Sequence, residues 1–305
     1  MNEPLLAVKD LSVTFPGSPE PLHAVRGLSY ELHEGQALAI VGESGSGKSI
    51  STRALLGLLP STARVTSGSA LYRGNDLLKL PAARLRRIRG AEIAMVFQNS
   101  SEALNPTLTL ETQLTEHLVW HGICKRGEAQ KRAVRALGDV GISEPEKRIR
   151  LFPFQLSGGM RQRAMIAMAT VTRPRLLIAD EPTTALDVTV QRQVLELFSE
   201  LKNAGTTTIM ITHDMGVARF FCDDVVVMLN GEAVERGDME TFIAGPQHPY
   251  SRRLLDANIE LGEGRRRRAT KTTPVDDGPP VEDASRPVIA PDQIDRLAQE
   301  VGTHG

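Results

Sequence analysis

Residues 37–49 constrain the fold of this chain more than any other stretch. They read ALAIVGESGSGKS, an apolar run that stops at Gly42 and continues as a glycine-rich turn. The turn fits the pattern G-x-x-x-x-G-K-[ST] at every fixed position, and its glycines let backbone N–H groups converge on an anion at the positive end of the following helix. The stretch predicts a phosphate-binding loop, with a plain glycine-rich strand-to-helix turn as the alternative. Its residues are Gly42, Glu43, Ser44, Gly45, Ser46, Gly47, Lys48 and Ser49.

The last two residues of the loop carry its chemistry. In such a loop the Lys48 ammonium would neutralise the β- and γ-phosphates of a nucleotide, and the Ser49 hydroxyl would ligate Mg²⁺. A dinucleotide-binding fingerprint is excluded, because no G-x-G-x-x-G can be drawn through these glycines. The loop therefore predicts a nucleotide with Mg²⁺ as its ligand.

Composition limits where such a chain can work. With 305 residues and 41% apolar content, the chain can form one large domain or two small ones with an ordinary core. Its net charge of −1 gives no overall attraction to nucleic acid or to an anionic membrane. Cys124 and Cys222 have no motif around them, which is typical of core thiols in a reducing compartment. Without a signal peptide or a long apolar run, we expect a cytosolic protein that reaches a membrane only through a partner.

Strand and helix patterns alternate along most of the chain. Two Val- and Leu-rich runs, 5–15 and 22–32, predict an antiparallel hairpin with Phe15 near its tip. Next we expect a helix that Pro60 ends, then a strand at 69–72, a basic helix at 81–90 and a buried strand at 93–97. Further strands are expected at 176–179, 207–211 and 225–229, with helices at 161–172, 188–202, 215–221, near 239 and at 250–260, and a hairpin at Gly231. This alternation predicts a parallel sheet covered on both faces.

Two segments depart from the alternation. Residues 100–154 hold many helix formers and almost no strand-like run, which predicts a helical insertion with helices at 111–119 and 127–140. The composition changes after residue 262, and residues 272–291 are rich in Pro and Asp with little to bury, which predicts disorder up to a short helix at 291–301 as an option. The run Arg265–Arg268 in this tail is typical of a solvated tether, with contact to lipid headgroups or to a partner's acidic face as the alternative.

Polar residues at the ends of predicted strands form the candidate site. Strand C-termini meet at one edge of a parallel sheet, so we expect Asp180 beside Ser49, where both would hold Mg²⁺. Glu181, one residue further on, is placed to activate water as a general base. His213 and Gln98 end two other strands, and His213 would reach the γ-phosphate. Capping, turn or buried structural roles are the alternatives for single residues, but one shared site explains all of them.

From residue 5 to about residue 260 the sequence resembles the ATP-binding cassette (ABC) family. The resemblance rests on GESGSGKS at 42–49 (Walker A), Gln98 (Q-loop), LSGGMRQR at 156–163 (signature), LLIADEP at 176–182 (Walker B), 184–187 (D-loop) and His213 (switch histidine). It implies an α/β fold, a RecA-like P-loop NTPase core with an antiparallel β subdomain and a helical insertion. The implied domains are an ABC ATPase domain at 1–262, with a helical subdomain at about 99–155 and a C-terminal accessory segment at about 231–262, and a largely disordered tail at 263–305.

The resemblance also implies a role for each site residue. Catalysis would fall to Glu181, His213 and Lys48, Mg²⁺ binding to Ser49, Gln98 and Asp180, and adenine stacking to Phe15. Cassettes of this family pair head to tail, so ATP held by one subunit would be contacted in trans by Ser157, Gly158, Gly159 and Asp187 of the other. Independently of the family, Ser157 precedes glycines that would expose N–H groups at a helix start, which makes a second anion site; a simple helix cap is the alternative.

Within the family, the sequence is similar to the ATPases of peptide, opine and nickel importers. The stretches GGMRQRAMIAMA, ADEPTTALDVTVQ, THDMGVA and the HPY at 248–250 carry this similarity. It implies ATP hydrolysis that powers import at the cytoplasmic face of the membrane. The implied partners are a second ABC ATPase subunit, identical or different, two permease subunits and, indirectly, an extracytoplasmic solute-binding protein, with no nucleic acid.

The sequence departs from this group at three places. It lacks the cysteine cluster that often follows the HPY stretch, so we expect no iron–sulfur cluster. Phe154 stands where peptide-type sequences commonly have His, and Asn99–Glu102 replaces a more usual Asp-Pro stretch. Phe154 weakens a peptide assignment and leaves nickel or metallophore cargo open.

Two other functions fit parts of the sequence. A soluble ABC ATPase acting on DNA or ribosomes would carry long coiled-coil or zinc-bearing insertions or tandem cassettes, whereas this chain has one cassette with a helical insertion. A module that binds ATP without turnover would not need Glu181 and His213. We therefore expect an importer ATPase.

Overall fold

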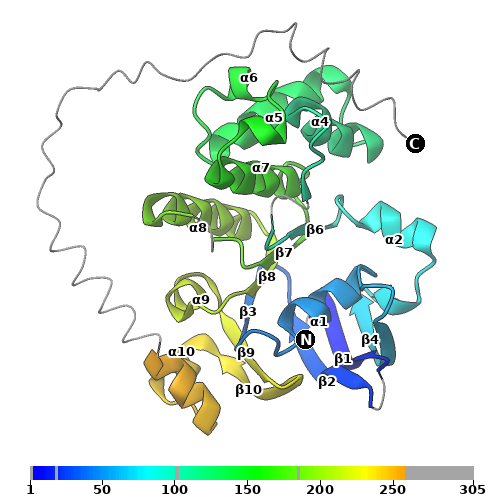
Figure 1. The fold of residues 1–305 in the computed structure, drawn as a ribbon, viewed down its shortest axis with the longest axis vertical. Coiled ribbons are helices and arrows are strands. Elements are labelled where there is room, and N and C mark those ends of the chain that lie inside the picture. Colours follow the sequence, from blue (N-terminus) through cyan, green and yellow to red (C-terminus); the bar gives the residue numbers. More distant parts are fainter. Residues whose placement is uncertain (1–2, 18–19, 100–102, 184–185, 258–305) are drawn as a thin grey trace, which may run out of the picture. The chain divides into compact units, whose positions relative to one another are not determined.

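A six-stranded sheet carries the site in this computed structural model, which describes residues 3–17, 20–99, 103–183 and 186–257 (Figure 1). In spatial order its strands are β10 (Glu232–Asp238), β9 (Asp224–Leu229), β3 (Ala37–Val41), β8 (Thr207–Ile211), β7 (Leu176–Asp180) and β6 (Ile93–Val96). The last five run parallel, and β10 pairs antiparallel with β9. The predicted parallel sheet is confirmed, and the carboxyl ends of its five parallel strands share one edge.

The sheet is buried on both faces because its strands are apolar throughout. Every residue of β3, β7 and β8 is buried. Successive side chains of a strand point to opposite faces. Accordingly, Ala39 and Val41 enter one core, which they share with the helices α7 (Gly158–Thr170), α8 (Val188–Asn203) and α9 (Met215–Phe221). Leu38 and Ile40 enter a second core, which they share with α1 (Lys48–Leu55) and another sheet. Such unbroken apolar runs are typical of parallel strands covered on both sides.

The second sheet has four antiparallel strands. They are β2 (Leu22–Leu32), β1 (Leu6–Phe15), β4 (Arg64–Tyr72) and β5 (Asn75–Asp76). β1 lies between β2 and β4, with Leu6 opposite both Leu32 and Tyr72. The predicted hairpin is confirmed. The prediction for β4 was too short, because the residues 64–68 that begin this strand are exposed and show no apolar pattern.

Helices gather between β6 and β7 in the sequence, as predicted for an insertion. They are α4 (Leu110–Trp120), α5 (Arg126–Asp139), α6 (Pro145–Arg148), the 3-10 turn η2 (Pro153–Gln155) and α7 (Gly158–Thr170). Leu114, Leu118, Ala129 and Ala133 pack with α7 in the first core, and Figure 1 shows α4, α5 and α7 side by side. The predicted helices at 111–119 and 127–140 are confirmed to within one residue, whereas α7 begins three residues before the predicted 161.

The other helices connect or flank the strands. They are α1 (Lys48–Leu55), η1 (Leu77–Lys79), α2 (Ala82–Ile88), α8 (Val188–Asn203), α9 (Met215–Phe221), α10 (Met239–Ala244) and a helical stretch at 249–257. The prediction that Pro60 ends the first helix was wrong. The helix ends at Leu55, because Gly57 at φ +57° donates to Ala54 O and Leu58 N donates to Arg53 O. This pair of bonds is the Schellman motif, which favours glycine at that position.

Three further expectations concern the two cysteines, membrane-spanning helices and the C-terminal tail. Cys222 is buried, as predicted for a core thiol, whereas Cys124 is only half-buried. Among the described helices, none is long and apolar enough to cross a membrane. The tail at 263–305, including Arg265–Arg268, lies outside the described residues, so its predicted disorder stays a prediction.

Candidate active site

The phosphate loop joins β3 to α1, and two of its three glycines are required because backbone oxygens of neighbouring segments pack against them. A Cβ on Gly42 (φ +148°) would lie 2.2 Å from Met228 O, and one on Gly47 (φ +98°) would lie 2.2 Å from Ala24 O. Neither backbone oxygen can move away cheaply. By contrast, a Cβ on Gly45 (φ +82°) would meet nothing within 4 Å. The loop is therefore closed on the protein side and open on the side from which an anion would approach.

The side chain of Lys48 folds back into this loop. Its Nζ donates to Gly42 O at 2.8 Å, to Glu43 O at 2.7 Å and to Ser46 Oγ at 3.4 Å, and the residue is 6% exposed. These three acceptors are neutral, so they position the ammonium without cancelling its charge. Burial lowers the pKa of Lys48, against the opposing pull of Glu181, Asp180 and Glu43. A buried cation at the mouth of an anion cradle suits a phosphate ligand.

Ser49 and Asp180 meet as predicted, at the start of α1 and the end of β7. Ser49 Oγ donates to Asp180 Oδ1 at 2.8 Å. Asp180 is 0% exposed, and its Oδ2 has no hydrogen-bond partner among the described residues. A buried carboxylate oxygen without a donor calls for a missing partner. A hydroxyl and a carboxylate are the oxygen ligands that Mg²⁺ prefers, so the pair fits this ion.

The Asp180 carboxylate, which is buried and has no donor to Oδ2 among the described residues, should cost stability when no ligand is bound. Burial raises the pKa of Asp180, although its hydrogen bond from Ser49 acts in the opposite direction. The pKa of Asp180 is higher in the folded than in the unfolded protein. The contribution of Asp180 to the free energy of unfolding is therefore most favourable below its ordinary pKa of about 4, and it is lost as pH rises through the folded pKa. We expect Asp180→Asn to raise the free energy of unfolding of the ligand-free protein by about 1 kcal/mol at pH 7, with the gain shrinking towards pH 4.

Urea unfolding at several pH values, without nucleotide or divalent ions, measures this gain. Asp139→Asn, at an exposed position on α5, is the matched control and should change the unfolding free energy little at any pH. An Asp180→Asn protein that is no more stable than wild type at pH 7 would contradict a net cost of burying this charge.

Glu181, Gln98 and His213 form a cluster next to the Ser49–Asp180 pair. Gln98 Nε2 donates to Glu181 Oε2 at 2.9 Å, and His213 Nδ1 lies 3.4 Å from Glu181 Oε1. Glu181 has a φ of +47°, a conformation that costs energy and that often occurs at functional sites. Its N–H bonds to Ile211 O at 2.9 Å, which fixes its backbone to β8. Gln98 therefore contacts the predicted general base, and among the hydrogen bonds of the described residues none joins it to the Ser49–Asp180 pair.

The signature stretch begins α7, and its residues Ser157 and Gly158 are exposed. Ser157 Oγ accepts from the N–H of Met160 at 3.3 Å, so it caps the helix as predicted. A Cβ on Gly158 would meet nothing within 4 Å, and one on Gly159 would meet only Leu186 Cδ2 at 3.9 Å. Neither Gly158 nor Gly159 has a positive φ. Nothing in the part of the chain that the structure describes thus requires glycine here, in contrast to Gly42 and Gly47.

Two other predicted site residues have structural partners that say little about ligands. Asp187 caps α8, where its Oδ1 accepts from the N–H of Val190 at 3.0 Å. Phe15 ends β1 and is half-buried against the second core, so it is less exposed than expected for the tip of a hairpin. Thr184 and Ala185 of the predicted D-loop lie outside the described residues.

One contact to the phosphate loop was not predicted from the sequence. Tyr250 Oη accepts from the N–H of Glu43 at 2.8 Å. The only signal for it in the sequence is the HPY stretch, which points to a family and not to a position in space. Gln98 and Glu181 are likewise 83 positions apart, and their hydrogen bond follows only from the folded sheet.

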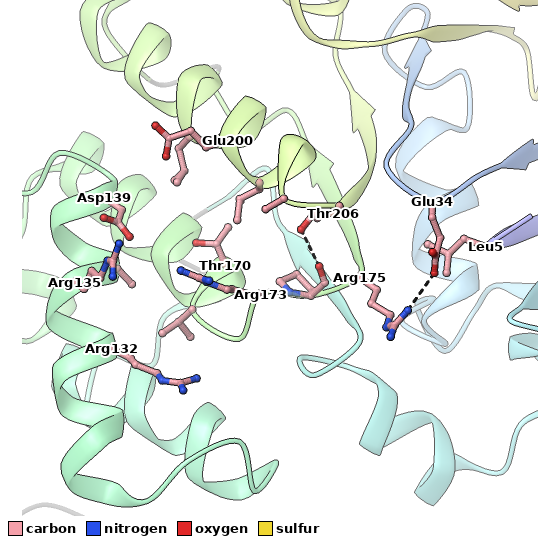
Figure 2. A pocket seen from close by; sticks show the side chains of 17 residues that line it. Leu5, Glu34, Arg132, Arg135, Asp139, Thr170, Arg173, Arg175, Glu200 and Thr206 are labelled. Atoms are coloured by element: carbon pink, nitrogen blue, oxygen red, sulfur yellow. Dashed lines mark hydrogen bonds and ion pairs between the residues drawn. The ribbon is translucent and has the colours of Figure 1, made fainter.

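A cavity of about 730 Å³ lies away from these residues (Figure 2). It is lined by α5, by the turn between α7 and β7, by the end of α8, and by Thr206 just before β8. These are the amino ends of the strands, opposite to the edge that carries the phosphate loop. Part of its charge is already paired, since Arg175 Nη1 lies 3.1 Å from Glu34 Oε1. We therefore place the candidate active site at the loop, where the cation, the orphaned carboxylate and the strained glutamate converge.

Known proteins are similar to this chain. Residues 25–184 match the profile of the family described as ABC transporter. The chain is 47% identical to the peptidoglycan transport ATP-binding protein YejF of Agrobacterium fabrum, over 94% of this chain and 50% of that protein. It is 45% identical to the dipeptide transport ATP-binding protein DppD of Bacillus subtilis (91% and 82%) and 48% identical to the oligopeptide transport ATP-binding protein OppD of Escherichia coli (83% and 75%). The chain thus spans half the length of the first relative and most of the other two.

Solved structures are similar as well. The dimeric cassette MJ0796, described as a bacterial ABC transporter cassette, superposes with a TM-score of 0.70 at 29% identity, over 77% of this chain and 98% of that chain. The same values hold for its dimeric post-hydrolysis state bound to ADP and phosphate. Both are dimers, and the second holds the products of ATP hydrolysis.

Proposed function

Since this chain belongs to the ABC transporter family, among the oligopeptide and dipeptide transport ATP-binding proteins, we propose that its hydrolysis of ATP drives the import of peptides. The observation that carries the proposal is the meeting of Lys48, the Ser49–Asp180 pair and Glu181 at one edge of the sheet. The relatives are named for dipeptide, oligopeptide and peptidoglycan transport, which favours peptide cargo over nickel or metallophores. The expectation drawn from Phe154, that a peptide assignment is weak, is corrected accordingly.

Each residue of the candidate active site has a part in the proposed reaction. The loop amides and Lys48 hold the phosphates and neutralise their charge. Glu181 accepts a proton from the attacking water, and His213, within 3.4 Å of it, orients that carboxylate. When bound, Mg²⁺ supplies further charge neutralisation on the phosphates, and Ser49 and Asp180 would hold it. Gln98 donates its Nε2 to Glu181, which leaves its amide oxygen Oε1 as the atom that would act as the predicted magnesium ligand.

The bare signature glycines support a second subunit as partner. Ser157 and Gly158 are exposed at the positive end of a helix of 13 residues, where an anion is stabilised by free N–H groups. No contact among the described residues requires these glycines, and their lack of side chains lets a partner protein approach the backbone closely. We place the triphosphate of a partner cassette there, with Asp187 nearby. The partner is a second copy of this chain or a different ABC ATPase.

The helical insertion offers the surface for the membrane partners. Phe154 is 67% exposed and stacks on Phe152 with ring centroids 5.5 Å apart, just ahead of the signature helix. Exposed aromatic pairs are typical of contact sites. Two permease subunits, fed by an extracytoplasmic solute-binding protein, would dock on this side and hold the ATPase at the cytoplasmic face. The reported relatives are transport proteins, so they give no support to the alternative of a soluble ABC ATPase acting on DNA or ribosomes.

Lys48→Ala tests the phosphate site. Removing a buried ammonium that faces the phosphates should weaken MgATP binding about 10- to 100-fold, the range for a charged hydrogen-bond donor. Isothermal titration calorimetry measures the affinity. Lys79→Ala removes an exposed lysine paired with Asp76 and should leave the affinity unchanged. Equal affinity of the Lys48→Ala and wild-type proteins would contradict the placement of the nucleotide.

A further inference from the structure

The peptide group between Gly42 and Glu43, at the entrance of the phosphate loop, is held at both ends. Its carbonyl oxygen accepts from Lys48 Nζ at 2.8 Å, and its N–H donates to Tyr250 Oη at 2.8 Å. A hydrogen bond at one end of a peptide group polarises it and strengthens the bond at the other end. The two contacts therefore support each other, although Tyr250 lies 207 positions along the chain.

Tyr250 is itself firmly anchored. It is 3% exposed and packs in the same core as Val41. Its N–H donates to His248 Nδ1 at 3.2 Å. Glu235 on β10 accepts from the N–H groups of Gln247 at 2.7 Å and His248 at 3.0 Å. One carboxylate on the sheet thus fixes the segment that presents the tyrosine hydroxyl to the loop.

The hydroxyl decides which way the loop's first peptide group faces. The C=O and N–H of a trans peptide point in opposite directions. With the Glu43 N–H turned to Tyr250, the Gly42 carbonyl faces Lys48, and this keeps the ammonium inside the loop. Without the hydroxyl, the Glu43 N–H loses its acceptor, and the Gly42–Glu43 peptide group is free to rotate. Misplacement of loop groups by about 1 Å is enough to weaken a preorganised site.

We propose that Tyr250 is a positioning residue for the phosphate loop, whose hydroxyl sets the affinity for MgATP through the Gly42–Glu43 peptide group. The inference rests on the proposed ATP site. It gives the C-terminal accessory segment a part in nucleotide binding. The competing role is that of an aromatic ring that only fills the core, in which case phenylalanine would serve equally well at this position.

Tyr250→Phe separates these roles, because it removes the hydroxyl and keeps the ring. We expect the KM for MgATP to rise about five- to tenfold with kcat within about threefold of wild type, the effect of one lost hydrogen bond. A merely structural defect would reduce the folded fraction, which lowers kcat and leaves KM unchanged. The matched control is Tyr72→Phe on β4, which also loses a hydroxyl contact, that to Glu92 at 3.3 Å, and should keep the wild-type KM.

A second variant keeps the test independent of how well Tyr250→Phe folds. Glu235→Gln leaves the tyrosine intact but removes one of the two acceptors that anchor residues 247 and 248, and we expect its KM to rise about two- to threefold. A KM within twofold of wild type in folded Tyr250→Phe, or an unchanged KM in Glu235→Gln when the other variant fails to fold, overturns the inference. A wild-type protein that does not turn over MgATP overturns the proposed function instead.

Discussion

Glu181→Gln is expected to lower steady-state ATP turnover about 100-fold or more while MgATP affinity stays within a few-fold of wild type. A positioned general base contributes about 10²- to 10⁴-fold to a rate, and glutamine cannot accept the proton. The substitution is nearly isosteric, so the contact with Gln98 and the backbone bond to Ile211 O can persist. Phosphate release measures turnover, and calorimetry measures affinity.

Glu116→Gln is the matched control, since it neutralises an exposed glutamate on α4 outside the site. It should have wild-type turnover. If Glu181→Gln retains more than a tenth of the wild-type rate, Glu181 is not the base, and the cluster with Gln98 and His213 needs another interpretation.

Gly158→Glu should abolish most turnover without harming the fold. Replacing a glycine in a helix, and placing a negative charge in its first turn, each stabilise a helix by about 0.5–1 kcal/mol. The site has room, because a Cβ there meets nothing within 4 Å. A carboxylate would nevertheless repel a partner's triphosphate and block the free N–H groups. We expect an unfolding free energy at or above wild type together with a loss of about 100-fold in turnover, comparable to losing one donor to a developing anion.

Gly127→Glu provides the control for this change. Gly127 is also exposed, lies in the first turn of α5 and has no neighbour within 4 Å of a Cβ. It should gain similar stability and keep full turnover. Normal turnover by a well-folded Gly158→Glu protein would show that the signature helix does not contact nucleotide.

Local patterns predicted the parts of the fold that depend on neighbours in sequence. The apolar runs of β3, β7 and β8 are buried on both faces, so their signal is strong, and they lie where expected. The end of α1 was misplaced because Pro60 was taken as the stop, although Gly57 forms the cap. The start of β4 was missed because its first residues are exposed and polar in pattern.

Contacts between distant segments could be predicted only as a shared edge of the sheet. That argument put Ser49 beside Asp180, which the structure shows at 2.8 Å. It could not foresee that Gln98 contacts Glu181, since a side chain's partner depends on rotamers and loop geometry. It also could not find Tyr250, whose position depends on the anchoring of residues 247 and 248 by Glu235.

We propose that two cassettes must close on each other before ATP is cut, and the ATPase rate per chain, measured at increasing protein concentration, distinguishes this from hydrolysis by a monomer. At saturating MgATP, phosphate release per chain should rise from near zero and level off over the same concentration range in which sedimentation detects dimers. A rate per chain that stays constant and high down to concentrations at which the protein is fully monomeric would contradict the account.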